Sequence, residues 1–207
     1  AGGSLPPAGG TLAVPSDFTQ VTELPGNRAS AEQLEMIHTR YAWAKEHAVG
    51  QEVLEAACGP GRGLGYLLRG GAREVVGLDY ERALVEMGNA HYQGRIKIVE
   101  GDAAVLPFAG ESFGLVILFE AIYYLPDAGR FVAEAKRVLK PGGRLLICSA
   151  NKEWSGFNPS PFSVRYDSAL ELRDLLAAHG FWTEMKAGFP ADERRGLRGA
   201  AVSLVRK

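Results

Sequence analysis

The chain has 207 residues, of which 46% are hydrophobic and 23% charged, and these proportions are typical of a folded globular domain rather than a disordered or fibrous chain. Its 23 Lys and Arg and 24 Asp and Glu give a formal net charge of −1, which offers no positive field for nucleic acid or anionic lipid. The longest apolar runs are far shorter than the roughly 20 residues of a membrane-spanning helix, and no signal peptide is visible. Composition therefore predicts a cytoplasmic protein with no membrane and no nucleic-acid partner.

Residues 1–25 are rich in glycine and proline and have no apolar period, so the sequence predicts a flexible lead-in without assigned chemistry. Residues 26–207 are expected to form a single domain. From Ser30 onward apolar residues recur at spacings of three and four, and Ser30 with Gln33 predicts a capping box. A helix over 30–47 is therefore expected to cap the domain.

Residues 51–149 alternate short apolar runs with helical patterns, which is typical of strand–helix–strand units and a largely parallel sheet. The expected strands cover 52–57, 74–78, 96–100, 114–119 and 144–149, and the expected helices cover 63–68, 81–91 and 128–139. A substrate-side loop over 150–166 and a helix over 168–179 follow. The last apolar runs, 181–187 and 199–205, could pair as an antiparallel hairpin.

The most informative segment is VLEAACGPGRG over residues 53–63, in which an apolar strand enters a glycine-rich turn and then a helix. Glycines at 59, 61 and 63 remove Cβ atoms that would keep a ligand away from the backbone, so a nucleoside is the expected occupant. A dinucleotide fingerprint would place its third glycine at position 64, where this chain has Leu64, and no GK[ST] phosphate loop is present. Taken alone, the turn could equally just join a strand to a helix.

Two acidic residues follow the next two expected strands. Asp79 ends the second strand and Asp102 follows the third, so both lie at the carboxyl edge of the sheet, where crevice ligands bind. Asp79 can accept ribose hydroxyls and Asp102 an amino proton from a base. Each residue also has a local interpretation, Asp79 as a helix N-cap and Asp102 as a turn residue.

Five segments in order, VLEAACGPGRG, VVGLD, GDAAVLPF, FGLVILFEAIYYL and RVLKPGGRLLI, resemble the class I S-adenosylmethionine-dependent methyltransferases over about half of the chain. The resemblance implies an α/β fold, a Rossmann-like, doubly wound and mostly parallel seven-stranded sheet with an antiparallel last strand and helices on both faces. It implies S-adenosyl-L-methionine as cofactor, S-adenosyl-L-homocysteine as product, and in-line displacement of the methyl group onto a small-molecule acceptor. The chain departs from the family at Gly114, where many members have Asp. This departure is expected to affect local packing of the strand and not cofactor binding.

The resemblance also implies roles for residues at matching positions. Glu55 is placed near the methionine end of the cofactor, Gly59 and Gly61 against it, Asp79 on the ribose, and Asp102 with Ala103 at the adenine. Tyr80 and Leu106 could supply apolar faces for the adenine ring or could be ordinary packing residues.

The acceptor side has weaker candidates. Glu120, Tyr123 and Tyr124 follow the fourth strand, and Glu120 could orient the acceptor or the cofactor amine, whereas the two tyrosines could equally pack under the next helix. On the capping helix, Arg40 or Tyr41 could bind the cofactor carboxylate, and His38 is the one plausible base, although packing or surface roles are open for all three. The loop residues Trp154, Phe157, Phe162, Arg165 and Tyr166 could cover an acceptor or anchor the loop.

Alternatives in other classes remain open from the sequence. The four histidines are dispersed, so no metal site is expected, and Cys58 and Cys148 are interpreted as small buried residues. A non-catalytic S-adenosylmethionine-binding module would keep the same glycine and acidic residues. An NAD-dependent oxidoreductase is disfavoured by the glycine spacing.

Overall fold

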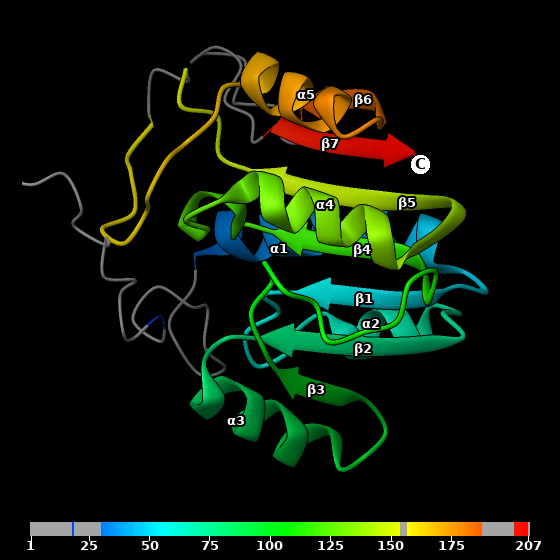
Figure 1. Cartoon of the computed structure of the whole chain (residues 1–207). Helices are drawn as coiled ribbons and strands as arrows, with labels where there is room; N and C mark the ends of the chain where they lie inside the picture. The colour runs from blue at the N-terminus through cyan, green and yellow to red at the C-terminus, as the bar shows by residue number, and fades with distance from the viewer. Residues whose placement is uncertain (1–17, 19–29, 154–156, 188–200, 207) are drawn as a thin grey trace, which may run out of the picture.

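The computed structural model describes Phe18 and residues 30–153, 157–187 and 201–206 (Figure 1). Its helices are α1 Ala31–Ala48, α2 Leu64–Arg69, α3 Arg82–Tyr92, α4 Ala128–Val138 and α5 Ala169–Ala178, with the short 3-10 helix η2 Ile122–Tyr124. Its strands are β1 Glu52–Ala56, β2 Glu74–Asp79, β3 Lys97–Glu100, β4 Phe113–Phe119, β5 Leu139–Ser149, β6 Trp182–Ala187 and β7 Ala201–Arg206. Over these ranges, every helix is too short or too polar to cross a bilayer.

The strands form one sheet in the order β3-β2-β1-β4-β5-β7-β6. Strands β1 to β5 pair in parallel, which confirms the expected α/β class, and β7 pairs antiparallel with both β5 and β6. The expected hairpin of the last two runs is thereby confirmed. Chain order reverses between β1 and β4, and ligands of open α/β sheets bind in the crevice beside such a switch point.

Both faces of the sheet are covered by helices. Along β4, Val116 and Leu118 pack with α4 and α5, whereas Leu115 and Ile117 pack with α1, α2 and α3, because successive side chains of a strand point to opposite faces. Figure 1 shows α4 in front of the sheet and α1 behind it. A strand buried on both faces reads as a continuous apolar run, which is why a strand over residues 114–119 could be assigned from the sequence.

Helix α1 begins as the sequence predicts. The Ser30 side chain accepts a hydrogen bond from the Gln33 backbone N–H, and the Gln33 side chain accepts one from the Ser30 backbone, so the capping box is confirmed. A second capping box, formed by Ser168 and Glu171, starts α5. Both helix starts are thus determined by local sequence.

The start of β5 differs from the prediction. The strand begins at Leu139 rather than at residue 144, because Leu139 already pairs with Phe113 before a register shift next to Gly114. A Cβ atom at Gly114 would collide with the side-chain oxygen of Gln51. Gly114 therefore makes room for Gln51 at the amino end of β4, far from the carboxyl edge of the sheet.

Candidate active site

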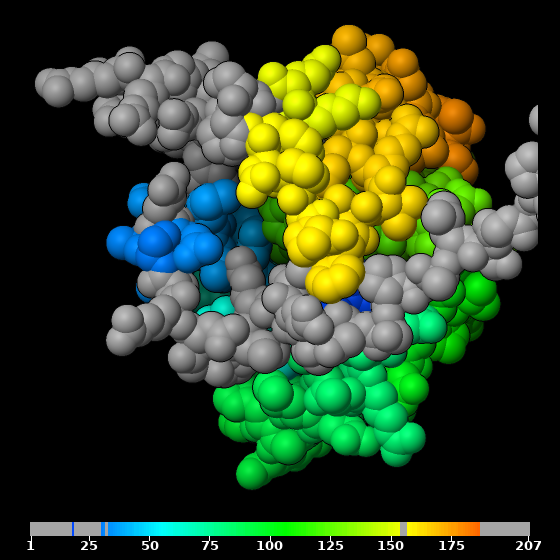
Figure 2. Space-filling view, turned by 90° about the vertical axis from the view of Figure 1, so that its left-hand side faces the viewer, coloured from blue at the N-terminus to red at the C-terminus, as the bar shows by residue number. Residues whose placement is uncertain are grey.

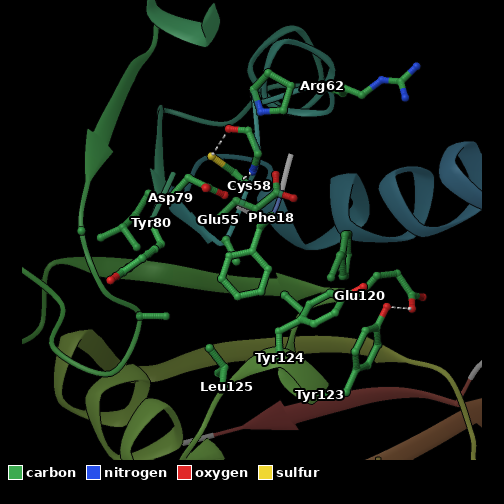
Figure 3. Close-up of a pocket in the computed structure, with 18 of the residues that line it drawn as sticks. Phe18, Glu55, Cys58, Arg62, Asp79, Tyr80, Glu120, Tyr123, Tyr124 and Leu125 are labelled. Carbon is green, nitrogen blue, oxygen red and sulfur yellow. Dashed lines mark hydrogen bonds between the residues drawn. The ribbon is translucent and has the colours of Figure 1, made fainter. Parts of the chain in front are cut away.

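A cavity of about 420 Å³ opens at the carboxyl ends of β1, β2, β3 and β4, a volume ordinary for a small-molecule site. Figure 2 looks onto this edge of the molecule, with α1 in blue, the loop over 157–166 in yellow and α3 in green around it. Figure 3 shows the lining side chains in close-up. Among the expected site residues, the lining includes Arg40, Tyr41, Glu55, Gly59, Asp79, Tyr80, Asp102, Ala103, Glu120 and Tyr123.

Glu55 is the buried carboxylate of the cavity, at 2% exposure. Its Oε1 accepts a hydrogen bond from the Tyr41 hydroxyl over 2.6 Å, whereas its Oε2 is buried and has no hydrogen-bond partner within the part of the chain that the structure describes. Burial raises the pKa of Glu55 to about 7, against the lowering effects of the Tyr41 hydrogen bond and of Arg40. A buried carboxylate with an oxygen that has no partner can accept a hydrogen bond from a positively charged group of a ligand.

Tyr41 positions Glu55 and closes the gap between α1 and the glycine loop. Burial and the neighbouring Glu55 hold the pKa of Tyr41 well above its usual range, so its hydroxyl remains a donor. Its ring packs edge-on against Phe119 at 5.4 Å and lies where a Cβ atom of Gly63 would be. The third glycine of the loop thus admits Tyr41, a packing role that the sequence analysis did not foresee.

Asp79 ties the glycine loop to the start of α3. Its Oδ2 accepts a hydrogen bond from Gly59 N–H over 2.6 Å and its Oδ1 one from Glu81 N–H over 2.9 Å. Burial raises the pKa of Asp79, and the two backbone donors oppose that shift. The N-cap of α3 is Glu81, so Asp79 is not the helix cap. A carboxylate has about four lone-pair sites, so two remain for a ligand.

Gly61 lies outside the cavity lining, in contrast to Gly59. It has a φ of +78°, and a Cβ atom there would lie 2.8 Å from the terminal methyl carbons of Ile98 and Leu64. The Tyr92 hydroxyl donates to its carbonyl. Gly61 is therefore required by the turn and by packing beneath the loop, and we do not propose it as a cofactor contact.

The end of the cavity near β3 has the residues expected at the adenine. Asp102 is exposed and its Oδ1 accepts a hydrogen bond from Ala104 N–H over 2.8 Å, so it stabilises a turn and also lines the cavity. The Tyr80 side chain is 57% exposed, so the face of its ring is available to pack against an adenine ring. Leu106 is a core residue outside the lining, so packing is its role here.

Glu120 follows β4 in a left-handed conformation, with φ of +50°, which is uncommon for a residue with a side chain. Its N–H donates to the Cys148 carbonyl over 2.8 Å. Its Oε1 lies 3.1 Å from Cys148 Sγ and 3.7 Å from Arg40 Nη1, and its Oε2 accepts from the Tyr123 hydroxyl over 3.2 Å. Backbone strain held by neighbours on several sides is a common feature of functional sites.

The loop over 157–166 packs against residues that line the cavity. Tyr166 stacks on Tyr123 at 4.4 Å, and the Tyr124 hydroxyl donates to Ser160 Oγ over 2.7 Å. Phe157, Phe162, Arg165 and Tyr166 are absent from the lining, and Arg165 pairs with Asp167. Of the two interpretations of this cluster, anchoring of the loop agrees with the structure; Trp154 lies outside the described residues.

His38 lies outside the cavity, on the exposed side of α1. Its ring packs edge-on against Tyr66 at 6.1 Å between centroids. We therefore do not propose it as a base. Helical spacing placed His38 on α1 but could not show which side of the helix faces the cavity.

Phe18 is a cavity residue that the sequence analysis missed. It lines the cavity, its N–H donates to Glu81 Oε1 over 3.0 Å, and its ring lies edge-on to Tyr124 at 5.6 Å. The lead-in has no apolar period, and the contacts of Phe18 with Glu81 and Tyr124 join residues that are 63 or more positions apart in the chain. Local sequence therefore carries no signal for this placement.

Comparison with known proteins finds similarity to methyltransferases. Residues 54–147 match the family model described as "Methyltransferase domain". A probable S-adenosylmethionine-dependent methyltransferase of Mycolicibacterium smegmatis is 38% identical over 160 residues, which are 74% of this chain and 60% of the relative. The phthiotriol/phenolphthiotriol dimycocerosates methyltransferase 1 of Mycobacterium ulcerans is 43% identical over 99 residues, 47% of this chain and 36% of that protein. This chain thus spans 60% or less of the length of these curated relatives.

Solved structures share the fold. The crystal structure of the [4+2]-cyclase SpnF superposes with a TM-score of 0.72 over 87% of this chain and 84% of that chain, at 21% sequence identity. At that identity the likeness concerns the fold alone. Together with the family match, it leads to one conclusion: residues 54–147 match a methyltransferase domain, and the chain is similar to S-adenosylmethionine-dependent methyltransferases and has a Rossmann-like fold.

Proposed function

We propose that the protein transfers a methyl group from S-adenosyl-L-methionine to a small-molecule acceptor. The observation that carries this proposal is the buried, unused Oε2 of Glu55 in a cavity that also holds Asp79. Two carboxylates in one enclosed site favour a ligand that is positively charged, and the donor has both an ammonium and a sulfonium group. When bound, the donor supplies an electrophilic methyl group with a neutral leaving group.

The chain's residues have distinct tasks on the donor side. Glu55 accepts hydrogen bonds from the ammonium group, and Gly59 lets the ligand approach the loop backbone. Asp79 uses its two remaining lone-pair sites for the ribose hydroxyls while its other sites hold the loop. Asp102 and Ala103 receive the adenine. These assignments follow from the positions of the residues around the cavity and from the family resemblance.

On the acceptor side, Glu120 and Tyr123 hold the reacting group and Arg40 holds Glu120. Methyl transfer depends mainly on alignment, so orientation of the acceptor by a fixed carboxylate is the contribution expected from these residues. A small-molecule acceptor, as opposed to a macromolecule, is supported by the Mycobacterium ulcerans relative, whose name specifies phthiotriol and phenolphthiotriol dimycocerosates.

The test is titration calorimetry of the purified chain with S-adenosylmethionine, S-adenosylhomocysteine and NAD. We expect dissociation constants on the order of micromolar for the two adenosyl sulfur compounds and no heat with NAD. Binding of NAD alone would contradict the proposal in favour of hydride chemistry. Binding of the donor without turnover over a broad panel of small acceptors would favour a non-catalytic binding module.

Replacement of Asp79 by Ala is expected to weaken S-adenosylhomocysteine binding by about 1 to 3 kcal/mol, because it removes charge-assisted hydrogen bonds to ligand and loop. The matched control is Asp127→Ala, which removes the N-cap bond to Arg130 N–H at α4, outside the cavity lining. The control should lose about 1 kcal/mol of stability and keep its affinity. Equal calorimetric affinities of Asp79→Ala and wild type would disprove the ribose role.

A further inference from the structure

Phe18 connects two sides of the cavity. Its backbone N–H donates to Glu81 at the start of α3, two residues beyond Asp79, and its ring meets Tyr124, which follows β4. Figure 3 shows the Phe18 ring between the Asp79 side and the Tyr124 and Leu125 side of the cavity. One aromatic side chain from the N-terminal lead-in therefore encloses a site otherwise built by the sheet edge and α1.

The cavity separates into an acidic and an apolar half. The ends of β1, β2 and β3 contribute the carboxylates Glu55, Asp79 and Asp102. The lining at the end of β4 and in the segment after it is apolar or aromatic apart from Glu120, and comprises Phe119, Ala121, Tyr123, Tyr124, Leu125 and Pro126. Because the Phe18 ring packs edge-on to Tyr124, it extends the apolar half.

We propose that Phe18 determines acceptor specificity and that the acceptor presents an apolar surface, an aromatic ring or a hydrocarbon segment, to Phe18 and Tyr124. The polar reacting group of such an acceptor lies at Glu120, which pairs with Arg40 at 3.7 Å at the edge of this half. The inference rests on the proposed function, since the acidic half must hold the methyl donor for the apolar half to hold the acceptor. The chemical class is thus an apolar alcohol, phenol or amine.

The experiment uses 2-naphthol, an apolar ring with one hydroxyl, as the probe on protein saturated with S-adenosylhomocysteine. We expect Phe18→Ala to weaken naphthol binding by about tenfold or more while changing S-adenosylhomocysteine affinity by less than about twofold. Phe18→Leu, which keeps an apolar side chain, should retain most of the affinity. The control Trp182→Ala removes a 62% exposed aromatic residue of β6, outside the cavity lining, and should change neither affinity.

Three outcomes would overturn the inference. The first is wild-type protein that does not bind 2-naphthol, and the second is equal naphthol affinity of Phe18→Ala and wild type. The third is a parallel loss of naphthol and S-adenosylhomocysteine affinity, which would place Phe18 over the donor. A wild type that does not bind S-adenosylhomocysteine would instead contradict the proposed function. Titration of 2-naphthol in the absence of S-adenosylhomocysteine separates failure of the proposed function from failure of the inference about Phe18.

Discussion

Replacement of Glu55 by Gln is expected to stabilise the protein above neutral pH and to weaken binding of the methyl donor. In the ligand-free protein, ionisation of Glu55 places a charge in a buried site that also contains Asp79, and burial raises its pKa from 4.5 to about 7. Glutamine keeps an oxygen that can accept the Tyr41 hydroxyl and removes the charge. The side chain that binding needs is therefore one that folding disfavours, as is common at functional sites.

The pH dependence follows from proton binding. Between about pH 4.5 and pH 7 the folded chain holds the Glu55 proton more tightly than the unfolded chain, so stability falls as pH rises through this window. Below it Glu55 is neutral in both states. The excess stability of Glu55→Gln should therefore be absent near pH 4.5 and reach on the order of 2 kcal/mol at pH 8, roughly 5 °C in the unfolding midpoint.

Donor affinity changes in the opposite direction. The ionised form of Glu55 binds the ammonium group, so wild-type affinity for S-adenosylhomocysteine should rise between pH 6 and pH 7.5, through the pKa of about 7 of Glu55. Affinity of Glu55→Gln should be roughly 10- to 100-fold lower at the upper end and nearly independent of pH, a loss typical of a charge-assisted hydrogen bond. Calorimetry over this range gives both quantities.

The matched control is Glu52→Gln, at the other end of β1. A hydrogen bond from Lys140 lowers the pKa of Glu52 to about 2, so its charge stabilises the folded state and its removal should lower the unfolding midpoint at neutral pH. Its distance from the cavity predicts unchanged donor affinity. If Glu55→Gln keeps its donor affinity as this control does, Glu55 is not the ammonium acceptor. If its unfolding midpoint falls at neutral pH, burial does not raise the pKa of Glu55 in the folded protein.

Much of the scaffold could be predicted from the sequence because the relevant signals are local. Strands β1 and β4 are buried on both faces and therefore read as apolar runs, and Ser30 marks the start of α1 through its own side chain. Parallel strands bring their carboxyl ends to one edge, so Asp79 and Asp102 could be placed in one site from the sequence, and the family resemblance added Glu55.

The site residues that the sequence describes least well are those whose contacts come from distant segments. Gly61 was expected at the cofactor, but its neighbours Ile98 and Tyr92 come from β3 and α3. Side-chain periodicity placed His38 on a helix without showing which side faces the cavity, and Phe18 enters the site from a segment with no pattern at all. Spacing in the sequence indicates which backbone segments lie at the cavity. It does not indicate which side chains from distant segments fill the rest of the cavity.

Gly63→Ala is the single-methyl change with the largest expected effect on the site. Gly63 has an ordinary helical φ of −92°, so the backbone tolerates alanine, but the new Cβ atom would occupy the position of the Tyr41 ring. Tyr41 must move, and with it the hydrogen bond to Glu55 and the contact with Phe119. We expect a loss of about 1 to 3 kcal/mol of stability, typical of an overpacked core, and at least about tenfold weaker S-adenosylhomocysteine binding.

Three further variants, Gly110→Ala, Tyr41→Ala and the double variant, decide whether Tyr41 is the cause. Gly110→Ala adds a methyl group to an exposed glycine whose nearest neighbour, the Arg137 carbonyl, would lie at an ordinary 3.4 Å, so its stability should be unchanged. In the double variant Tyr41→Ala with Gly63→Ala the collision is removed, so the second substitution should cost almost nothing beyond Tyr41→Ala alone. Thermal unfolding of the four proteins measures this coupling, and strictly additive losses would show that Gly63 matters for a reason other than room for Tyr41.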